Sequence, residues 1–494
     1  MSKEASFRRG RWTWRVAPTE TGRMEELTAL IERRPADARP VKTTDGRRSI
    51  WTATIPGDGV AFVKRYTKPR LLKQLKALFR NSRTRQEWEM GRRCEELGLP
   101  VARHLAMAER RRFGLLAEDY LIQEALEGFR NFDDWFRDGG AEADRDGRVS
   151  ERRDAVIRLA RLIRRLHHLG VVQRDFKPDS VMVGPDGAFK LVDLERALVR
   201  SGVPWDSRLD NLAKLDQTFA FIGSAGDRLR FLREYFMVEG LTRGEIAAAA
   251  TEIARRSEQL ARKEAHDRRA WAAGNNMIYR QFTVGGCRVS AHYEMPRTTI
   301  EEAVNNLGAG AGREFRCEWK PGLHYLFRGV WCEAAEALGH VPALQYRKAP
   351  FVPARAAIFP PGSTGFGLLL HQVTEPPLLE VREGYRQSRV FGRGEDYVFA
   401  LAQWVRVCHR MGIWWRDLRP DSILYDPNHP GLLGRFIINR LDLLAMDLRF
   451  SREAGEGACR RIEEMIELSP ERRASFRQDY ARSRLRWFRE ERRY

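Results

Sequence analysis

The chain has 494 residues, 43% of them hydrophobic, which is enough for two ordinary domains with their own cores and excludes bulk disorder. Lys and Arg outnumber Asp and Glu by 87 to 67. The resulting net charge of +20 favours an anionic partner, such as nucleic acid, anionic lipid or a phosphorylated glycan, without choosing among them.

The cysteines and the hydropathy of the sequence limit the cellular compartments in which the protein is expected. The six cysteines lack metal-site or Cys-x-x-Cys spacing, which argues for a reducing compartment and against a disulfide framework. No stretch approaches the roughly 20 apolar residues that span a bilayer, and the start of the chain lacks the apolar run of a signal peptide. We expect a protein that is soluble or lies on a membrane surface.

The first part of the chain predicts a small sheet after a basic N-terminal extension over residues 1–40. Residues 50–55 and 60–66 are predicted to be strands, because both are rich in β-formers and a Gly-Asp-Gly turn separates them. Lys64 stands near the end of the second strand. A helix is predicted from about Arg85 to Leu97, with Glu87 in its first turn.

The next elements lead to two aspartates. Residues 119–125 (DYLIQEA) predict a strand, and apolar residues at helix spacing over 156–169 predict a helix that ends at Gly170. Residues 174–182 (RDFKPDSVM) predict a loop that carries Asp175. Residues 189–193 predict a strand with Asp193 at its end.

The second half repeats this order. Residues 416–424 (RDLRPDSIL) match residues 174–182, and Asp417 follows Asp175 by 242 residues (417 − 175). Gly412 follows Gly170 by the same interval, again at the end of a predicted helix. We therefore predict an α+β fold made of two related domains, residues 41–265 and 280–494, each with a β-rich N-terminal lobe and a helical C-terminal lobe.

The residues of the first half suit phosphoryl transfer, which depends mainly on positioning and charge neutralisation. A strand-borne lysine such as Lys64 can bind phosphates, and a helix-borne acid such as Glu87 can hold it in place. Asp175 can accept the proton of an attacking hydroxyl, and Asp193 can hold Mg²⁺. Each residue alone is explained as well by a solvated charge, a turn or a helix cap; their order and partial repetition favour a site.

These motifs resemble the lipopolysaccharide kinase family of the protein-kinase-like superfamily, which phosphorylates heptose or Kdo of the lipopolysaccharide core. Residues 174–176 resemble its H-R-D-F loop, residues 191–197 (LVDLERA) its metal-binding I-D-L-D-R-A, and residues 82–88 (SRTRQEW) its S-R-A-x-x-E-W helix start. Residues 119–125 resemble the strand that leads into the adenine-binding hinge. The resemblance covers roughly residues 40–240 and implies protein-kinase-like bilobal domains in tandem, with ATP and Mg²⁺ as cofactors.

The resemblance also implies a role for each site residue. The catalytic residues would be Asp175 and Lys177, the ATP-binding residues Lys64, Glu87, Gln123, Glu124 and Ala125, and the metal ligands Asp193 and Ser180. Gln173 departs from the family by replacing the loop histidine, and Ser180 replaces the asparagine of protein kinases. The nearest candidate for a phosphate-covering turn, residues 45–48, is weak.

The second half departs further from the family. Asp417 and Asp442 match the two aspartates of the first half. Aligning residues 289–293 with the strand of Lys64 leaves Ala291 where a lysine is needed, and the position of Glu87 falls on Arg328. Without the lysine–glutamate pair, phosphates would be poorly aligned, so we predict that the second half is a pseudokinase.

The resemblance implies a cytoplasmic kinase, peripheral on the inner membrane, that transfers the γ-phosphate of ATP to a sugar hydroxyl of the lipopolysaccharide core or another anionic glycolipid. A regulatory tandem pseudokinase that scaffolds a partner, and a kinase of a protein or small molecule, remain alternatives. Basic segments at residues 68–80 and around Trp487 suit either a solvated helix face or a membrane surface. No nucleic-acid-binding module is recognised, so nucleic acid is not expected as a partner.

Overall fold

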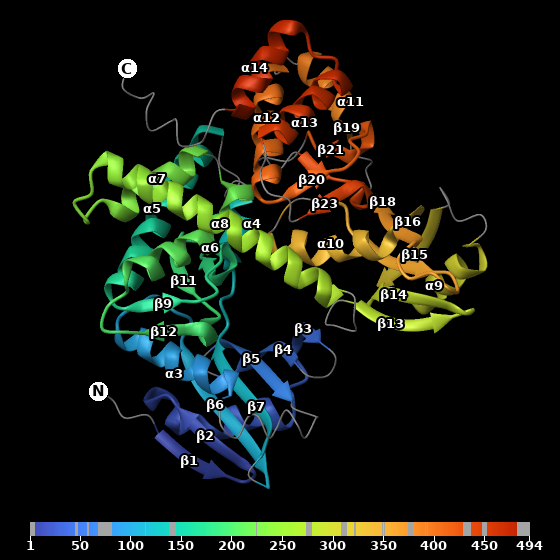
Figure 1. Ribbon diagram of the computed structural model, residues 1–494. Coiled ribbons are helices and arrows are strands. Elements are labelled where there is room, and N and C mark those ends of the chain that lie inside the picture. The colour runs from blue at the N-terminus through green and yellow to red at the C-terminus, as the bar shows by residue number, and fades with distance from the viewer. Residues whose placement is uncertain are drawn as a thin grey trace. The chain divides into compact units, whose positions relative to one another are not determined.

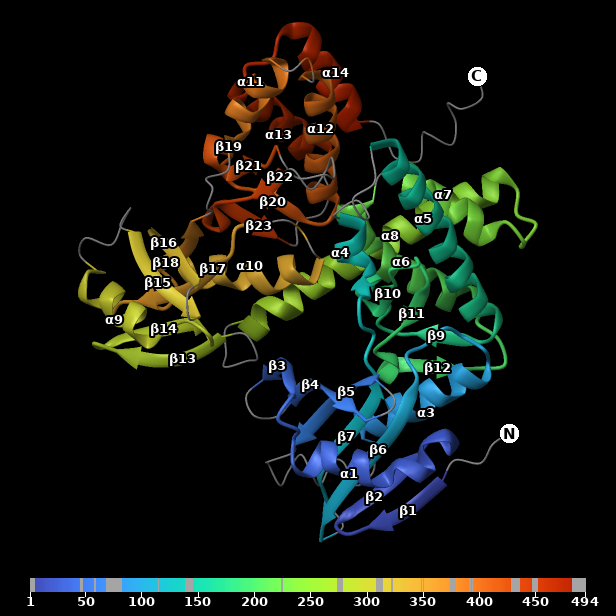
Figure 2. The same ribbon diagram turned by 180° about the vertical axis from the view of Figure 1, so that it is seen from behind.

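The fold was analysed in a computed structural model (Figures 1 and 2). It describes residues 5–44, 48–56, 59–67, 82–113, 115–137, 145–223, 225–272, 279–307, 314–320, 323–347, 349, 351–373, 379–390, 392, 394–427, 436–446 and 452–481. The turn at 45–47, the basic segment 68–80 and the tail around Trp487 therefore lie outside the described residues. The fold mixes helices and sheets, as predicted, and divides into two compact units, Met1–Trp135 with Arg158–Asn211 and Phe136–Ile157 with Leu212–Tyr494.

The first unit contains a seven-stranded antiparallel sheet with the order β1-β2-β6-β7-β5-β4-β3. Its strands are β1 (Ala5–Arg9), β2 (Trp12–Val16), β3 (Arg39–Thr44), β4 (Arg48–Ile55), β5 (Gly59–Thr67), β6 (His104–Arg112) and β7 (Leu115–Glu124). In β2, Trp12, Trp14 and Val16 are buried and Thr13 is exposed, which is the alternation of a strand with one face on a core. Part of the predicted N-terminal extension thus forms two strands of this sheet.

Three helical segments accompany the first sheet: η1 (Pro18–Arg23), α1 (Met24–Glu32) and α3 (Arg83–Glu96). Helix α1 contributes Leu27 and Leu30 to the core formed with Trp12, Trp14 and Trp51. The predicted helix of Glu87 is α3. It begins after Ser82, whose side chain accepts a hydrogen bond from the Arg85 N–H and so caps the first turn.

Short strands and turns follow the first sheet. They are β8 (Arg130–Asn131), β9 (Val171–Gln173), η2 (Pro178–Ser180), β10 (Val181–Val183), β11 (Phe189–Leu191), η3 (Leu194–Arg196) and β12 (Ala197–Val199). Strands β11, β10 and β8 form one small sheet, and β12 pairs with β9 in another. The helices of this region are α4 (Phe132–Arg137), α5 (Arg145–His168) and α6 (Trp205–Ile222). Helix α5 ends before Gly170, whose φ of 78° is the left-handed conformation that suits glycine.

The second unit contains α7 (Ala225–Phe236), α8 (Arg243–Ala272) and a six-stranded antiparallel sheet with the order β13-β14-β17-β18-β16-β15. Its strands are β13 (Tyr279–Val284), β14 (Cys287–His292), β15 (Glu314–Lys320), β16 (Leu323–Cys332), β17 (Ala354–Phe359) and β18 (Gly367–Val373). Helix α9 (Arg297–Asn305) lies between β14 and β15 in the chain, and α10 (Ala334–Arg347) between β16 and β17.

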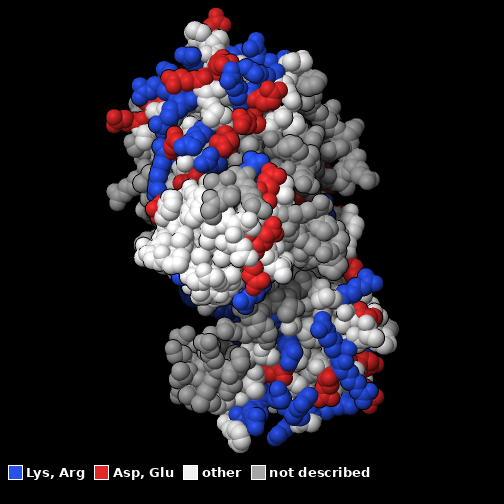
Figure 3. Space-filling model, turned by 90° about the vertical axis from the view of Figure 1, so that its right-hand side faces the viewer, with Lys and Arg blue, Asp and Glu red and all other residues white. Residues whose placement is uncertain are grey.

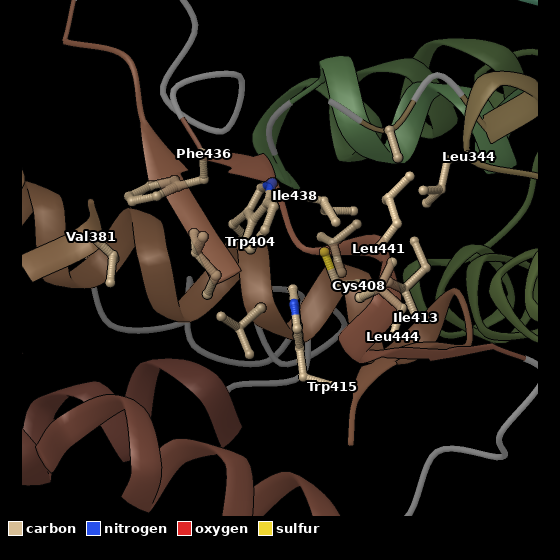
Figure 4. Packing of buried hydrophobic residues seen from close by; sticks show 14 of the residues in the cluster. Leu344, Val381, Trp404, Cys408, Ile413, Trp415, Phe436, Ile438, Leu441 and Leu444 are labelled. Atoms are coloured by element: carbon tan, nitrogen blue, oxygen red, sulfur yellow. The ribbon is translucent and has the colours of Figure 1, made fainter. Parts of the chain in front are cut away.

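The rest of the second unit is mainly helical. Its elements are β19 (Leu379–Glu380), α11 (Val381–Val390), α12 (Gly394–Arg410), β20 (Ile413–Trp415), η5 (Pro420–Ser422), β21 (Ile423–Tyr425), β22 (Phe436–Ile438), η6 (Leu441–Leu443), β23 (Leu444–Met446), α13 (Arg452–Met465) and α14 (Pro470–Ala481). Trp404, Cys408 and Leu441 pack in its core (Figure 4). None of the described helices combines the length and the apolar character needed to cross a membrane.

The two large sheets have the same strand order. If β13 and β14 are matched with β1 and β2, and β15 to β18 with β4 to β7, the six strands of the second sheet follow the order of six strands of the first, and α10 takes the place of α3. Only the edge strand β3 has no counterpart among the described strands. The small sheets match as well, with β19-β21-β22 for β8-β10-β11 and β20-β23 for β9-β12. The similarity of element order therefore extends well beyond the repeated motif.

Candidate active site

Lys64 lies between two carboxylates of the first unit. Its Nζ is 2.7 Å from Glu87 Oε1 on α3 and 2.7 Å from Asp193 Oδ1, which follows β11. The side chains of Lys64 and Glu87 are 4% and 2% exposed, whereas that of Asp193 is 59% exposed. The structure thus brings together three residues that the sequence separates by up to 129 positions (193 − 64), as the sequence analysis predicted.

Strand geometry explains why Lys64 points away from the core of the sheet. Ala61 and Val63 alternate along β5 and pack in the core that contains Trp12 and Trp51. Lys64 therefore faces the other side, toward α3.

The charge of Lys64 is stabilised by its two partners. Burial on its own lowers the pKa of Lys64, but the charges of Glu87 and Asp193 outweigh that effect and raise the pKa above its ordinary value. Lys64 therefore stays protonated throughout the physiological range and presents a permanent cation at this position.

Asp175 lies in the loop after β9. Its Oδ1 is 3.7 Å from Lys177 Nζ, and its Oδ2 is 3.7 Å from Arg196 Nη1. The antiparallel pairing of Gln173 with Ala197 places the loop after β9 beside the turn that precedes β12, which contains Arg196. Sequence reasoning did not identify Arg196 as a neighbour of Asp175; the only signal was its place in the motif at 191–197.

A chain of hydrogen bonds connects this loop with Asp193. The Gln173 side chain donates to the Asp193 carbonyl oxygen at 2.6 Å, and the Asn211 side chain donates to the Gln173 carbonyl oxygen. His167 Nε2 lies 3.1 Å from Asn211 Oδ1. Gln173 thus holds the aspartate backbone from the position where the family has a histidine. Asn211 was not predicted, since it belongs to an ordinary amphipathic helix, α6.

Ser180 and Asp193 are neighbours through the backbone. The Val192 N–H donates to the Ser180 carbonyl oxygen at 3.0 Å. Asp193 is strained, with φ at 55° in the left-handed region, and its exposed carboxylate is a hard oxygen donor of the kind Mg²⁺ prefers. Among the described residues no group of three or more His, Cys, Asp or Glu could hold a metal ion.

The predicted hinge residues have mostly internal partners. Gln123 is buried, with its Nε2 2.8 Å from His104 Nε2. The Glu124 carboxylate accepts a hydrogen bond from the Arg103 N–H at 2.9 Å and also pairs with Lys190. The Ala125 N–H donates to Val60 O at 2.8 Å. Any contact of this segment with an adenine would therefore use backbone carbonyl groups and apolar surface.

The second unit places different residues at the equivalent turn. The Asn439 N–H donates to the Ser422 carbonyl oxygen at 3.0 Å, as Val192 does to Ser180. The following residue, Arg440, has a φ of 49° and precedes η6, as Asp193 precedes η3. Arg440 therefore takes the place of Asp193. The prediction that Asp442 does so is wrong, because Asp442 lies inside the turn of η6.

Strand pairing also corrects the position equivalent to Lys64. Strand β14 corresponds to β2, so the alignment of Ala291 with Lys64 is wrong. In the first half, the Glu124 N–H donates at 2.9 Å to the carbonyl oxygen of Arg103, the residue just before β6. In the second half, the Gln372 N–H donates at 3.0 Å to the carbonyl oxygen of Pro353, the residue just before β17. Ala61 and Phe327 are the respective strand partners of Glu124 and Gln372. Lys64 lies three residues after Ala61 on β5, and Val330 lies three residues after Phe327 on β16, so Val330 corresponds to Lys64.

The helix after this strand gives the position equivalent to Glu87. The Leu99 N–H donates to Cys94 O at 3.0 Å at the end of α3, and the Ala349 N–H donates to Leu344 O at 3.1 Å at the end of α10. Counting back equally from these ends, Ala337 corresponds to Glu87. The prediction of Arg328 is therefore wrong, although the predicted loss of the lysine and the glutamate agrees with Val330 and Ala337.

Comparison with known proteins finds a family that resembles the first half of the chain. Residues 32–235 match the lipopolysaccharide kinase (Kdo/WaaP) family. The resemblance predicted from the motifs is confirmed, and the lipopolysaccharide kinase segment contains every residue of the Lys64 and Asp175 sites described above. The similarity of this segment to a kinase family supports phosphotransferase activity.

Two solved structures are also similar to parts of this chain. WaaP in complex with acyl carrier protein is 24% identical, with 50% of this chain and 97% of that chain covered and a TM-score of 0.37. The kinase domain of a Toxoplasma gondii rhoptry antigen is 14% identical, with 33% and 50% covered and a TM-score of 0.23. Both scores are low and add nothing to the family match. No curated protein matches the chain.

Proposed function

We propose that the first half of the chain is an ATP-dependent kinase that transfers phosphate to a sugar hydroxyl of the lipopolysaccharide core. One observation carries the proposal: Lys64 is held at 2.7 Å by both Glu87 and Asp193, within a segment that matches a lipopolysaccharide kinase family. A buried lysine–glutamate pair beside an exposed aspartate is the arrangement that phosphoryl transfer from a magnesium-bound nucleotide requires.

Each residue would have a distinct task. Lys64, oriented by Glu87, would bind the phosphates, and Asp193 with Ser180 would hold Mg²⁺. Asp175 would accept the proton of the acceptor hydroxyl, and Lys177 would steady the transferred group. Bound ATP would supply the phosphoryl group, with its base near the segment of residues 123–125.

The acceptor is proposed from the family and from charge. A net charge of +20 suits an anionic glycolipid, which long-range attraction would draw to the protein at low ionic strength. On the face shown in Figure 3, Lys and Arg side chains are interspersed with Asp and Glu. Attraction on that face would therefore be spread over many groups. We place the protein in the cytoplasm, peripheral on the inner membrane, where such a substrate is available.

The second half is proposed to be a degenerate copy of the same kinase-like domain. The two domains would be residues 41–265, whose sheet also includes β1 and β2 from the preceding segment, and residues 280–494. The shared strand order supports this proposal, as does the presence of Asp417 at the place of Asp175. Val330, Ala337 and Arg440 stand where the first half has Lys64, Glu87 and Asp193. A domain with these replacements would be a pseudokinase.

The test is transfer from labelled ATP to purified lipopolysaccharide core, beside generic protein acceptors, with products mapped by mass spectrometry. Asp175→Asn should lower transfer by about 10²–10⁴-fold, because it removes the base and leaves the shape unchanged. Asp186→Asn is the matched control, since Asp186 only caps the turn between β10 and β11 through the Ala188 N–H. Undiminished transfer by Asp175→Asn would refute the catalytic assignment.

The same experiment separates the alternatives. Transfer to protein acceptors alone would replace the sugar acceptor in the proposal. Nucleotide binding without transfer to any acceptor would favour a regulatory pseudokinase that scaffolds a partner.

A further inference from the structure

Arg440 is held by two carboxylates in the second unit. Its Nε and Nη2 lie 3.0 Å and 2.7 Å from the two oxygens of Asp442, and its Nη1 lies 3.0 Å from Asp421 Oδ2. The Asp442 side chain is 6% exposed and that of Asp421 is 38% exposed. The planar guanidinium therefore makes a bidentate pair with a buried acid and a further bond with a partly exposed one.

This arrangement inverts the charges of the first half. There, the strand supplies the cation, Lys64, and the left-handed position supplies the acid, Asp193. In the second half the left-handed position supplies the cation, and Val330 on the strand packs against an apolar core that includes Ala337. One cation lies between two carboxylates in both cases, but Arg440 occupies the place where the first half offers an oxygen ligand.

The inversion removes the groups that a magnesium-bound nucleotide needs. The acids closest to the turn, Asp421 and Asp442, are both paired with Arg440, so a metal there would compete with the guanidinium for their oxygens and would face its fixed positive charge. Val330 offers phosphates no cation. Burial raises the pKa of Asp442, but its pairing with Arg440 outweighs this effect and lowers the pKa below its ordinary value. The carboxylate therefore stays ionised and paired.

A second ion pair connects the same region with α10. Arg416, at the start of the repeated motif, pairs with Glu336, the neighbour of Ala337 on the helix that corresponds to α3. In the first half, the helix and the turn are linked through Lys64 and through the pair of Arg83 on α3 with Glu195 on η3. The second half thus has its own contacts between the helix, the loop and the turn, made entirely by protein side chains.

We propose that the Arg440–Asp442–Asp421 centre is a built-in replacement for metal and nucleotide, which keeps the loop and turn of the second half assembled without any ligand. The inference goes beyond the proposed function and rests on it only in assigning nucleotide binding to the first half. The second half then binds no magnesium-bound nucleotide, and the full chain has a single site.

The first test counts sites on the full chain by calorimetric titration with Mg²⁺ and a non-hydrolysable ATP analogue. We expect one equivalent for the wild type and none for Lys64→Met. A second equivalent that survives in Lys64→Met would overturn the inference. Absence of binding to the wild type would instead refute nucleotide binding by the first half. It would agree with a second half that binds no nucleotide, and the stability of Arg440→Met would then decide whether Arg440 holds the loop and turn together.

The second test measures the stability that Arg440 supplies. Arg440→Met leaves two acids without their cation and should lower the Tm of the second unit by about 4–8 °C, with no recovery on addition of Mg²⁺ and the analogue. Arg297→Met is the matched control, because its pair with Glu301 is exposed on α9, and it should change Tm by less than about 2 °C. An Arg440→Met variant as stable as this control would overturn the inference.

Discussion

The two partners of Lys64 should contribute very differently to stability. Both carboxylates lie 2.7 Å from Nζ, so the Coulomb energy at an effective dielectric constant of about 20 is the same, roughly 6 kcal/mol for each pair before desolvation. Their surroundings differ, because the Glu87 side chain is 2% exposed and that of Asp193 is 59% exposed. Water screens the second pair and not the first.

We expect Glu87→Gln to lower the free energy of unfolding of the first unit by about 2–4 kcal/mol, because it leaves a buried ammonium with one partner. Asp193→Asn should lower it by about 0–1 kcal/mol, the range of exposed pairs. Both changes keep the volume and a hydrogen-bonding oxygen, so each variant is a control for the other.

Urea unfolding followed by tryptophan fluorescence would measure the difference, since Trp88 is buried next to Glu87 in α3. Hydrogen exchange of the amides of β5 would assign the loss to the first unit, because a chain with two compact units need not unfold in one step. Equal losses for the two variants, or a larger loss for Asp193→Asn, would contradict the role given to burial.

Three further predictions concern individual side chains. Gln173→Leu should reduce transfer at least about tenfold by releasing the Asp193 carbonyl, while Gln173→His, which retains a donor, should keep most of it; equal rates would count against this role. Burial lowers the pKa of His409 to about 3, so its contribution to stability is present above pH 6.5 and is lost as the pH falls toward 3. Between pH 6.5 and pH 5 the wild type should therefore lose about 2 kcal/mol more than His409→Gln in urea titrations, and equal losses would contradict this pKa. Ser82→Ala should cost about 1–2 kcal/mol in the same assay because it removes the cap of α3, and an unchanged midpoint would show that the cap contributes nothing.

Local signals predicted the elements of the first half well. The strand of Lys64 and the helix of Glu87 occur close to their predicted bounds, and α5 ends where predicted before Gly170 but begins at Arg145, eleven residues earlier than predicted. Periodicity and turn residues determine such elements over short distances. The meeting of Lys64, Glu87 and Asp193 was predicted from motif order, and the family match supports the resemblance on which that prediction depended.

Features that depend on pairing between distant segments were missed. Arg196 approaches Asp175 because β9 pairs with β12, and Asn211 reaches the Gln173 carbonyl from a helix with no local signal. The matching of the second half failed for the same reason. The second half was matched to the first through short local sequence similarities, which do not determine strand pairing, so Ala291, Arg328 and Asp442 were assigned to positions that strand pairing gives to other residues.

The corrected positions strengthen the contrast between the halves. With Asp442 as a metal ligand, the second half would have kept both aspartates and lost only the lysine and the glutamate. With Arg440 in that place, the second half also lacks the carboxylate that we propose as the metal ligand of the first, and a cation pairs with both remaining acids. Unpaired buried polar groups destabilise a fold through their desolvation. Asp421 and Asp442 avoid this cost by pairing with Arg440, whereas the buried His371 ring that interacts with Asp442 has no hydrogen-bond partner among the described residues. The ion pairs of Arg440 and Arg416 replace the contacts of Lys64, which is what a domain retained for its folded shape requires.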